Sequence, residues 1–136
     1  MKKIYVGCSL THAPDEFKHG VDAIKNELRK DFEVMDFLGL VAGTAEDVYQ
    51  WDIHNCVQKC DFFVAITDHP SLGLGYEMAT AVEKLQKPTL ALAQTQSKIG
   101  RIILGIEQPH YRFARYDTLE DIPALVKAFA AKFAAV

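Results

Sequence analysis

Residues 61–77, DFFVAITDHPSLGLGYE, hold the pattern that decides the fold class of this chain. An apolar run ends at Asp68, a Pro-Ser turn and two close glycines follow, and Tyr76 and Glu77 stand at the front of a helical pattern. This order predicts a parallel strand, a glycine loop and the N-terminus of a helix. In open α/β sheets, ligands bind at that point, beyond the carboxyl ends of the strands.

Strand-like and helix-like patterns alternate along the rest of the chain, without repeats or linkers. Short apolar runs predict strands at five places, which are 3–9, 32–38, 61–67, 88–93 and 110–116. Apolar residues at helical spacing, helped by start signals such as Pro14 and Thr44, predict the intervening helices. These helices are expected over 14–28, 44–60, 73–86, 99–106 and 118–133.

Five strands that alternate with helices indicate a parallel sheet covered on both faces. Because crossovers are right-handed, we expect a flavodoxin-like α/β fold, a doubly wound five-stranded parallel sheet in the order 2-1-3-4-5. Residues 1–136 would form a single domain. The switch point of this sheet lies between the first and third strands. The loop 8–13 should therefore lie beside the loop 68–77, so that two distant segments form one crevice.

Composition argues against several classes of protein. The chain has 136 residues, of which 49% are hydrophobic and 24% charged, as is typical of a globular domain. A net charge of −3 gives no support to nucleic-acid binding, which usually shows a basic face. No apolar run approaches the roughly 18 residues of a membrane span, and no apolar leader follows the first residues, so we expect a cytoplasmic protein.

The cysteines and histidines do not suggest a disulfide framework or a metal site. The three cysteines are Cys8, Cys56 and Cys60, an odd number in a chain expected to be cytosolic. No two of the five histidines stand at ligand spacing. A P-loop lysine and the full dinucleotide fingerprint are absent as well. We therefore expect neither a metal nor a cofactor.

Glu77 is the first candidate for chemistry. A glutamate at a helix start commonly only complements the helix dipole. Here it follows Gly73 and Gly75, and the missing Cβ atoms would let the backbone approach a ligand closely. A carboxylate in that position would be a nucleophile, a base or a hydrogen-bond acceptor for sugar hydroxyls.

A second carboxylate would complete an acid–base pair, and Asp52 is the leading candidate. On the helix predicted over 44–60 it lies about 100° from Ile53, at the edge of the buried face. Such a side chain points either into a crevice or into water, and water is the commoner outcome. Asp47 and Asp68 are alternatives for the same role.

Ser9 and Ser71 place hydroxyl groups in the two facing loops, and Cys8 opens the first of these loops. The two serines cap turns or, together with backbone N–H groups, hold a phosphate or a ribose. Tyr5 lies inside the first strand, where the residue pattern alone is that of a core aromatic side chain.

The segment PSLGLGYEMATAV at 70–82 closely resembles the nucleoside 2-deoxyribosyltransferase superfamily, and within it the branch of 2'-deoxynucleoside 5'-phosphate N-hydrolases. The opening IYVGCSL at 4–10 fits the same group. The resemblance implies cleavage of the N-glycosidic bond of a nucleoside or nucleotide, by hydrolysis or by transfer to a second base. Glu77 falls on the catalytic glutamate of the family, which attacks the anomeric carbon, and Tyr5 falls on its active-site tyrosine.

The resemblance also bears on the other candidates. Ser9 and Ser71 fall on hydroxyls near the sugar-phosphate, and Asp52 is the nearest match to the second carboxylate, one residue out of register. Residues 10–13, LTHA, stand where the hydrolase branch usually has an arginine and two glycines. Ser97 is the nearest match to a further phosphate-contacting serine.

The family tends to form dimers whose partner completes the site, so we expect a homodimer or a larger homo-oligomer. The isoleucine-rich stretch 99–106 is a candidate for the contact surface. A non-catalytic nucleotide-binding module, which would keep the glycine loop and lack a working acid, is the alternative from a different class.

Overall fold

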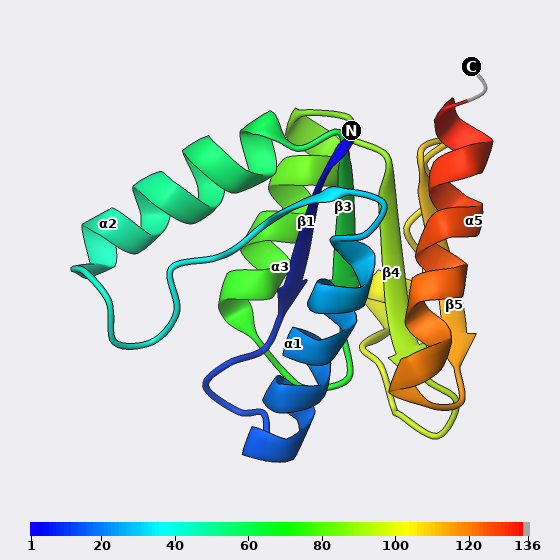
Figure 1. Cartoon of the computed structure of the whole chain (residues 1–136), viewed down its shortest axis with the longest axis horizontal. Coiled ribbons are helices and arrows are strands. Elements are labelled where there is room, and N and C mark those ends of the chain that lie inside the picture. Colours follow the sequence, from blue (N-terminus) through cyan, green and yellow to red (C-terminus); the bar gives the residue numbers. More distant parts are fainter. Residues whose placement is uncertain (135–136) are drawn as a thin grey trace.

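Five parallel strands form one sheet in the order β2-β1-β3-β4-β5 in the computed structural model, which describes residues 1–134 (Figure 1). The strands are β1 (Lys3–Cys8), β2 (Glu33–Met35), β3 (Phe62–Ile66), β4 (Thr89–Gln94) and β5 (Tyr111–Tyr116). All five predicted strands are present, every neighbouring pair is parallel, and the predicted order is confirmed. The fold is the flavodoxin-like α/β arrangement.

Helices connect the strands at the places that the sequence predicts. They are α1 (Asp15–Leu28), α2 (Ala45–Tyr49), η1 (Gln50–Val57), α3 (Leu72–Ala79), η2 (Thr80–Lys84), α4 (Arg101–Leu104), η3 (Leu119–Asp121) and α5 (Ile122–Ala134). In Figure 1, α2 and η1 run together as one long helix that extends beyond the edge of the sheet. The helix expected over 73–86 is likewise made of α3 and η2, and both η1 and η2 are wound as π-helices.

Two predicted elements are shorter than the sequence suggests. The second strand ends at Met35, because the next residues turn their backbone groups toward η1 instead of the sheet. The helix expected over 99–106 is reduced to α4, which lies between Gly100 and Gly105. Ile103 and Ile106 pack against the core, whereas Ile102 is 80% exposed.

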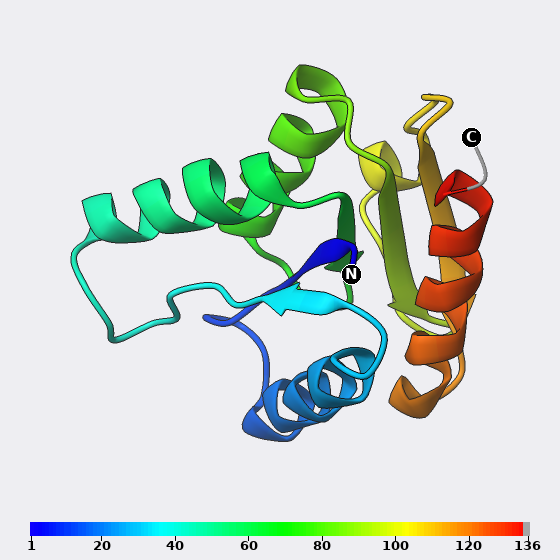
Figure 2. The ribbon, with the colours of Figure 1, turned by 45° about the horizontal axis from the view of Figure 1, so that its top comes forward.

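The sheet divides two apolar cores, because alternate residues of each strand point to opposite faces. One face is covered by α1 and α5, and the other by η1, α3, η2 and α4 (Figure 2). On the first face, Ile4, Val6, Val64 and Leu92 point toward α1 and α5. Tyr5 and Phe63 point to the second face, so that face carries the candidate site.

The carboxyl ends of β1 and β3 lie side by side, in the register that pairs Cys8 with Ile66. Ser9 Oγ donates a hydrogen bond of 2.9 Å to the carbonyl oxygen of Pro70. This bond ties the loop after β1 to the loop after β3, so the two segments converge as predicted. Among the described residues, none of the helices is long and apolar enough to cross a membrane.

Candidate active site

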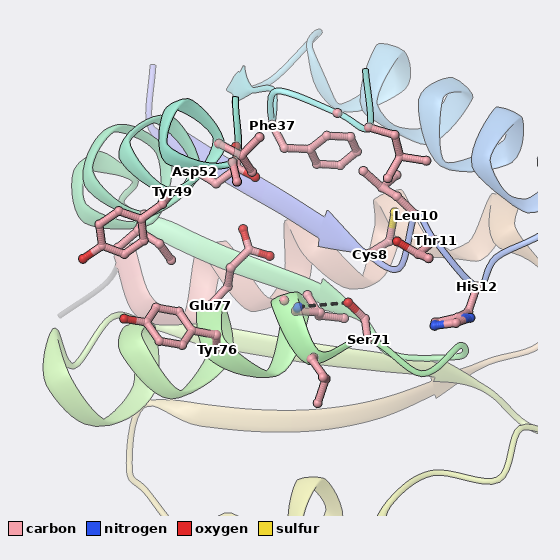
Figure 3. Close-up of a pocket in the computed structure, with 18 of the residues that line it drawn as sticks. Cys8, Leu10, Thr11, His12, Phe37, Tyr49, Asp52, Ser71, Tyr76 and Glu77 are labelled. Atoms are coloured by element: carbon pink, nitrogen blue, oxygen red, sulfur yellow. Dashed lines mark hydrogen bonds between the residues drawn. The ribbon is translucent and has the colours of Figure 1, made fainter. Parts of the chain in front are cut away.

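A cavity of about 500 Å³ opens at the carboxyl ends of β1 and β3 (Figure 3). Its walls come from β1, from the loops that follow β1 and β2, and from the helices α2, η1 and α3. Tyr49 and Tyr76 lie at one end of it, with ring centroids 6.4 Å apart. Thr11, His12 and Ser71 lie at the other end. Binding cavities for small molecules commonly have this size and this mixture of apolar walls and few polar groups.

Glu77 lies between these two ends and points into the cavity (Figure 3). It stands in the second turn of α3, beyond the first turn where an acidic side chain would serve the helix dipole. The hydroxyl of Ser71 accepts a hydrogen bond of 3.0 Å from the backbone N–H of Leu74 and so begins the helix. With only 9% of its surface exposed, Glu77 is a buried carboxyl group.

The hydroxyl of Tyr5 donates a short hydrogen bond to Oε2 of Glu77. Tyr5 is fully buried in β1 and stacks on Phe63, with ring centroids 5.5 Å apart. Burial, with the nearby carboxylates adding to it, raises the pKa of Tyr5 far above its usual range, so the phenol keeps its proton. The structure therefore holds one oxygen of Glu77 in a fixed place.

Burial raises the pKa of Glu77 to about 7, and the negative charge of Asp52 adds to this rise. The hydrogen bond from Tyr5 and the positive charge of Lys25 act in the opposite direction. The pKa of Asp52 is raised as well, by burial, against the opposing effects of the Leu38 N–H group and of Lys25. Two carboxyl groups with raised pKa values in one cavity are typical of acid–base chemistry near neutral pH.

Asp52 is half-buried on η1, and its side chain points into the cavity from the side facing Glu77 (Figure 3). Its Oδ1 accepts a hydrogen bond of 3.0 Å from the backbone N–H of Leu38. Asp52 thus faces the crevice rather than water, a choice that the helical pattern alone did not decide.

The two alternative aspartates have other partners and do not line the cavity. Asp47 closes a capping box, because its Oδ2 accepts a hydrogen bond of 3.0 Å from the backbone N–H of Thr44. Asp68 accepts three hydrogen bonds beyond β3, from the backbone N–H of Gln94 (2.7 Å), from Ser97 Oγ (2.5 Å) and from the Tyr116 hydroxyl (2.5 Å). Both aspartates therefore hold chain segments together.

The remaining predicted site residues divide into two groups. Cys8, Ser71 and Gly73 line the cavity, and burial raises the pKa of the Cys8 thiol to about 11, so it is neutral at pH 7. Ser9 is 1% exposed and lies outside the lining, and its hydroxyl donates a hydrogen bond to the carbonyl oxygen of Pro70. Gly75 lines a separate cavity of about 140 Å³, and a Cβ atom there would meet nothing within 4 Å.

Gly7 and Phe37 belong to the site and were not singled out from the sequence. A Cβ atom on Gly7 would lie 3.0 Å from Cδ1 of Leu74 and 3.4 Å from Oε1 of Glu77. A glycine inside a buried strand is a known sign that another group approaches closely, and this signal was available in β1. Phe37 has no such signal, because it reaches the cavity only after β2 has ended.

Among residues 1–134, no three His, Cys, Asp or Glu side chains lie close enough together to hold a metal ion. The cavity lining in the same part of the chain contains no lysine or arginine. An anionic group bound there would depend on backbone N–H groups, hydroxyls and His12.

Comparison with known proteins gives consistent relatives at low identity, although no protein-family model matches the chain. It is 42% identical over 62 residues to the 5-hydroxymethyl-dUMP N-hydrolase of Rattus norvegicus, covering 46% of this chain and 36% of that protein. It is 33% identical over 97 residues to the "Putative 2'-deoxynucleoside 5'-phosphate N-hydrolase 1" of Syntrophotalea carbinolica, covering 70% and 64%. The aligned segments thus span between about one third and two thirds of these relatives' own lengths.

Two solved structures share the fold. A CMP N-glycosidase of Clostridium botulinum superposes with a TM-score of 0.73 at 16% identity, over 94% of this chain and 99% of that one. A 2-desoxiribosyltransferase of Leishmania mexicana superposes with a TM-score of 0.63 at 18% identity, over 92% and 96%. These two superpositions show the shared fold, and the sequence relatives of the chain are N-hydrolases of the nucleoside 2-deoxyribosyltransferase and N-hydrolase superfamily, to which the chain is therefore similar.

Proposed function

We propose that this protein hydrolyses the N-glycosidic bond of a nucleoside or nucleoside 5'-monophosphate, with Glu77 as the nucleophile and Asp52 as the general acid. The observation that carries the proposal is the pair of inward-pointing carboxyl groups, one buried and bonded to Tyr5, in a cavity large enough for one nucleoside. The N-glycosidase and N-hydrolase relatives support the same reaction class.

The chemistry follows from the charge that develops at the sugar. Breaking a glycosidic bond passes through an oxocarbenium-like transition state, which a carboxylate beside the anomeric carbon stabilises. Ionised Glu77 would attack that carbon and form a glycosyl ester, while protonated Asp52 gives its proton to the departing base. Asp52 would then take a proton from water as the hydroxyl adds to the anomeric carbon, which releases the sugar and restores Glu77.

The two ends of the cavity suit the two parts of such a substrate. Tyr49 and Tyr76 offer aromatic faces on which a base can stack. Thr11 and Ser71 offer hydroxyl groups to a sugar or a phosphate at the opposite end. Glu77 stands between them, where the bond that joins base and sugar would lie.

Incubation with a panel of deoxynucleosides, ribonucleosides and their 5'-monophosphates, followed by chromatography for free base, tests the proposal. We expect base release by the wild-type protein and none by Glu77→Gln, since loss of a required catalytic carboxylate costs orders of magnitude in rate. Glu83→Gln is the matched control, because Glu83 is exposed, lies outside the cavity lining and accepts a hydrogen bond from Gln108.

Each result has a separate meaning. A Glu77→Gln variant that keeps most of the wild-type rate removes Glu77 from the mechanism. Binding of a nucleotide without base release favours a non-catalytic binding module. Formation of a new nucleoside only when a second free base is supplied identifies a transferase.

A further inference from the structure

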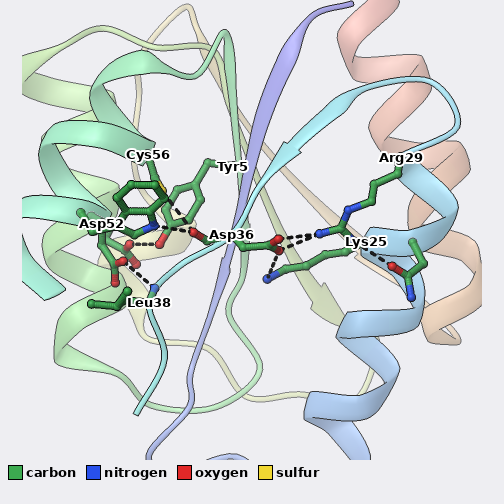
Figure 4. A network of polar contacts seen from close by, with 10 residues as sticks. Tyr5, Lys25, Arg29, Asp36, Leu38, Asp52 and Cys56 are labelled. Atoms are coloured by element: carbon green, nitrogen blue, oxygen red, sulfur yellow. Dashed lines mark hydrogen bonds and ion pairs between the residues drawn. The ribbon is translucent and has the colours of Figure 1, made fainter. Parts of the chain in front are cut away.

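We propose that Lys25 is a positioning residue for the candidate active site. Through its ion pair with Asp36 it holds residues 36–38, the segment that contacts Asp52 and forms one wall of the cavity (Figure 4). The inference rests on the proposed roles of Glu77 and Asp52.

Lys25 is a buried cation next to the cavity wall. It lies on α1 with 2% of its surface exposed, and its Nζ is 3.7 Å from Oδ1 of Asp36 and 3.7 Å from the centroid of the Phe37 ring. Lysine is almost never fully buried unless it is paired. The partner carboxylate of Asp36 is itself 58% exposed, and an ion pair with an exposed group contributes little to stability. Stability alone therefore gives little reason for a buried lysine at this position.

The segment 36–38 follows β2 and contacts both α1 and η1. Arg29 donates two hydrogen bonds of 2.7 and 2.8 Å to the Asp36 carboxylate, so this carboxylate is held by both Arg29 and Lys25. The backbone carbonyl of Asp36 faces the other way and accepts hydrogen bonds from Trp51 Nε1 (2.7 Å) and Cys56 Sγ (3.5 Å). One residue thus links the lysine to the helix that carries Asp52.

The next two residues of the segment reach the site itself. The Phe37 ring lines the cavity, and the Lys25 ammonium group packs against this ring. The N–H of Leu38 donates the 3.0 Å hydrogen bond to Oδ1 of Asp52. A shift of residues 36–38 would therefore move both the cavity wall and the hydrogen bond that orients the proposed acid, and small misplacements can cost about 100-fold in rate.

The charge of Lys25 also acts on both carboxyl groups at a distance. It lowers the pKa of Asp52 and of Glu77, against the burial that raises them. Burial lowers the pKa of Lys25 itself. The ionisable groups that act on Lys25 are Asp36 after β2, Cys8 in β1, Asp22 on α1 and Arg29 at the end of α1. Loss of the charge at position 25 should thus raise the pKa of both carboxyl groups.

Two variants separate the charge of Lys25 from the position of the segment. Lys25→Met keeps an apolar stem beside Phe37 and removes the charge, whereas Asp36→Asn keeps the shape and removes the anchor. Asp31→Asn is the matched control, because Asp31 pairs with Lys127 at 3.0 Å, at similar exposure and outside the cavity lining. Thermal unfolding checks that each variant is folded.

The measurements are the pH profile of base release and a ¹³C NMR titration of the Glu77 carboxyl group. We expect Lys25→Met to move the acid limb of the profile and the Glu77 titration to higher pH. Asp36→Asn should move them to lower pH, because it removes a negative charge. Both variants should lose about tenfold or more in kcat, while Asp31→Asn behaves like the wild type.

A Glu77 titration in Lys25→Met that coincides with the wild-type curve overturns the inference, as does an unchanged kcat in a folded Asp36→Asn protein. The NMR titration needs no turnover. A wild-type protein without base release therefore refutes the proposed function, while the titration still reports on Lys25.

Discussion

At the scale of single residues, a carboxyl group enclosed by protein determines what the site can do. Glu77 is 9% exposed, and its only hydrogen bond within the described residues comes from Tyr5. Burial makes the ionised form costly, which raises the pKa of the group to about 7. A carboxyl group that titrates near neutral pH is useful to an enzyme and unfavourable for the fold.

This conflict predicts how Glu77→Gln changes stability with pH. Because the folded pKa lies above the unfolded value of 4.5, the stability that protonated Glu77 contributes is fully present below pH 4.5 and is lost as the pH rises through about 7. Relative to wild type, the Gln variant should gain about 3 kcal/mol between pH 4 and pH 8. Denaturant unfolding of both proteins at these two pH values measures the difference. A constant difference would mean that Glu77 titrates normally.

Asp52 gives a second prediction at this scale, concerning the leaving group. Asp52→Asn should slow the release of poor leaving bases more than that of good ones, because a general acid matters most when the leaving group is poor. Rates for a series of bases on one sugar measure this dependence. An equal loss for every base would mean that Asp52 positions the substrate, and no loss at all would leave it without a part in the reaction.

At the scale of elements, the packing of β1 against α3 places Glu77. Gly7 of β1 lies close to α3, since a Cβ atom there would lie 3.0 Å from Cδ1 of Leu74 and 3.4 Å from Oε1 of Glu77. Gly75 lies on α3 itself, and a Cβ there would meet nothing within 4 Å. The expectation that Gly75 must stay small to admit a ligand stays a prediction, whereas Gly7 has a steric reason within the protein to be glycine.

The two glycines form a matched pair for mutagenesis. Gly7→Ala should reduce base release by about tenfold or more, because the added Cβ atom would press on the Leu74 side chain and on Oε1 of Glu77 and so displace the carboxylate. Gly75→Ala should keep the activity and stabilise the protein by up to about 1 kcal/mol, since alanine favours a helix over glycine. Steady-state kinetics and thermal unfolding of both variants test this. Equal activity in the two would show that β1 leaves more room than the structure indicates.

At the scale of the whole molecule, the parallel sheet brings two distant segments to one crevice, and its outer surface remains available to a partner. Around α4, Ile103 and Ile106 pack inward, whereas Ile102 and Leu104 are 80% and 46% exposed and are free to form a contact. Leu72, which lines the cavity, and Val41, which follows the lining residue Leu40, are 96% and 97% exposed. The expected homo-oligomer thus has apolar surface at more than one place.

Light scattering on the purified protein tests that expectation. We expect a mass of at least twice the 15.2 kDa of one chain at micromolar concentration. If α4 lies in the contact, Ile102→Asp should lower the mass without unfolding the protein, because this side chain takes no part in the core. A wild-type mass of one chain would refute the assembly, and a dimer unaffected by Ile102→Asp would place the contact elsewhere.

The sequence by itself determined the five strands, their order and the place of the crevice. Apolar period, helix start signals and the glycine turn at 70–75 are local properties, and right-handed crossovers convert them into one topology. It also indicated Glu77 as the central residue, through its place after that turn. The length of β2 was overestimated, because the bonds that draw residues 36–38 away from the sheet come from η1, which is distant in sequence.

Only the tertiary structure decided which side chains meet Glu77. Whether Asp52, Asp47 or Asp68 faces the cavity depends on the rotation of η1 about its axis and on hydrogen bonds to β4, β5 and the start of α2, none of which a local pattern contains. The use of Ser9 as a tie between loops and the burial of Lys25 against Phe37 have the same origin. They arise from contacts between residues far apart in the chain, which form only when the two faces of the sheet are packed.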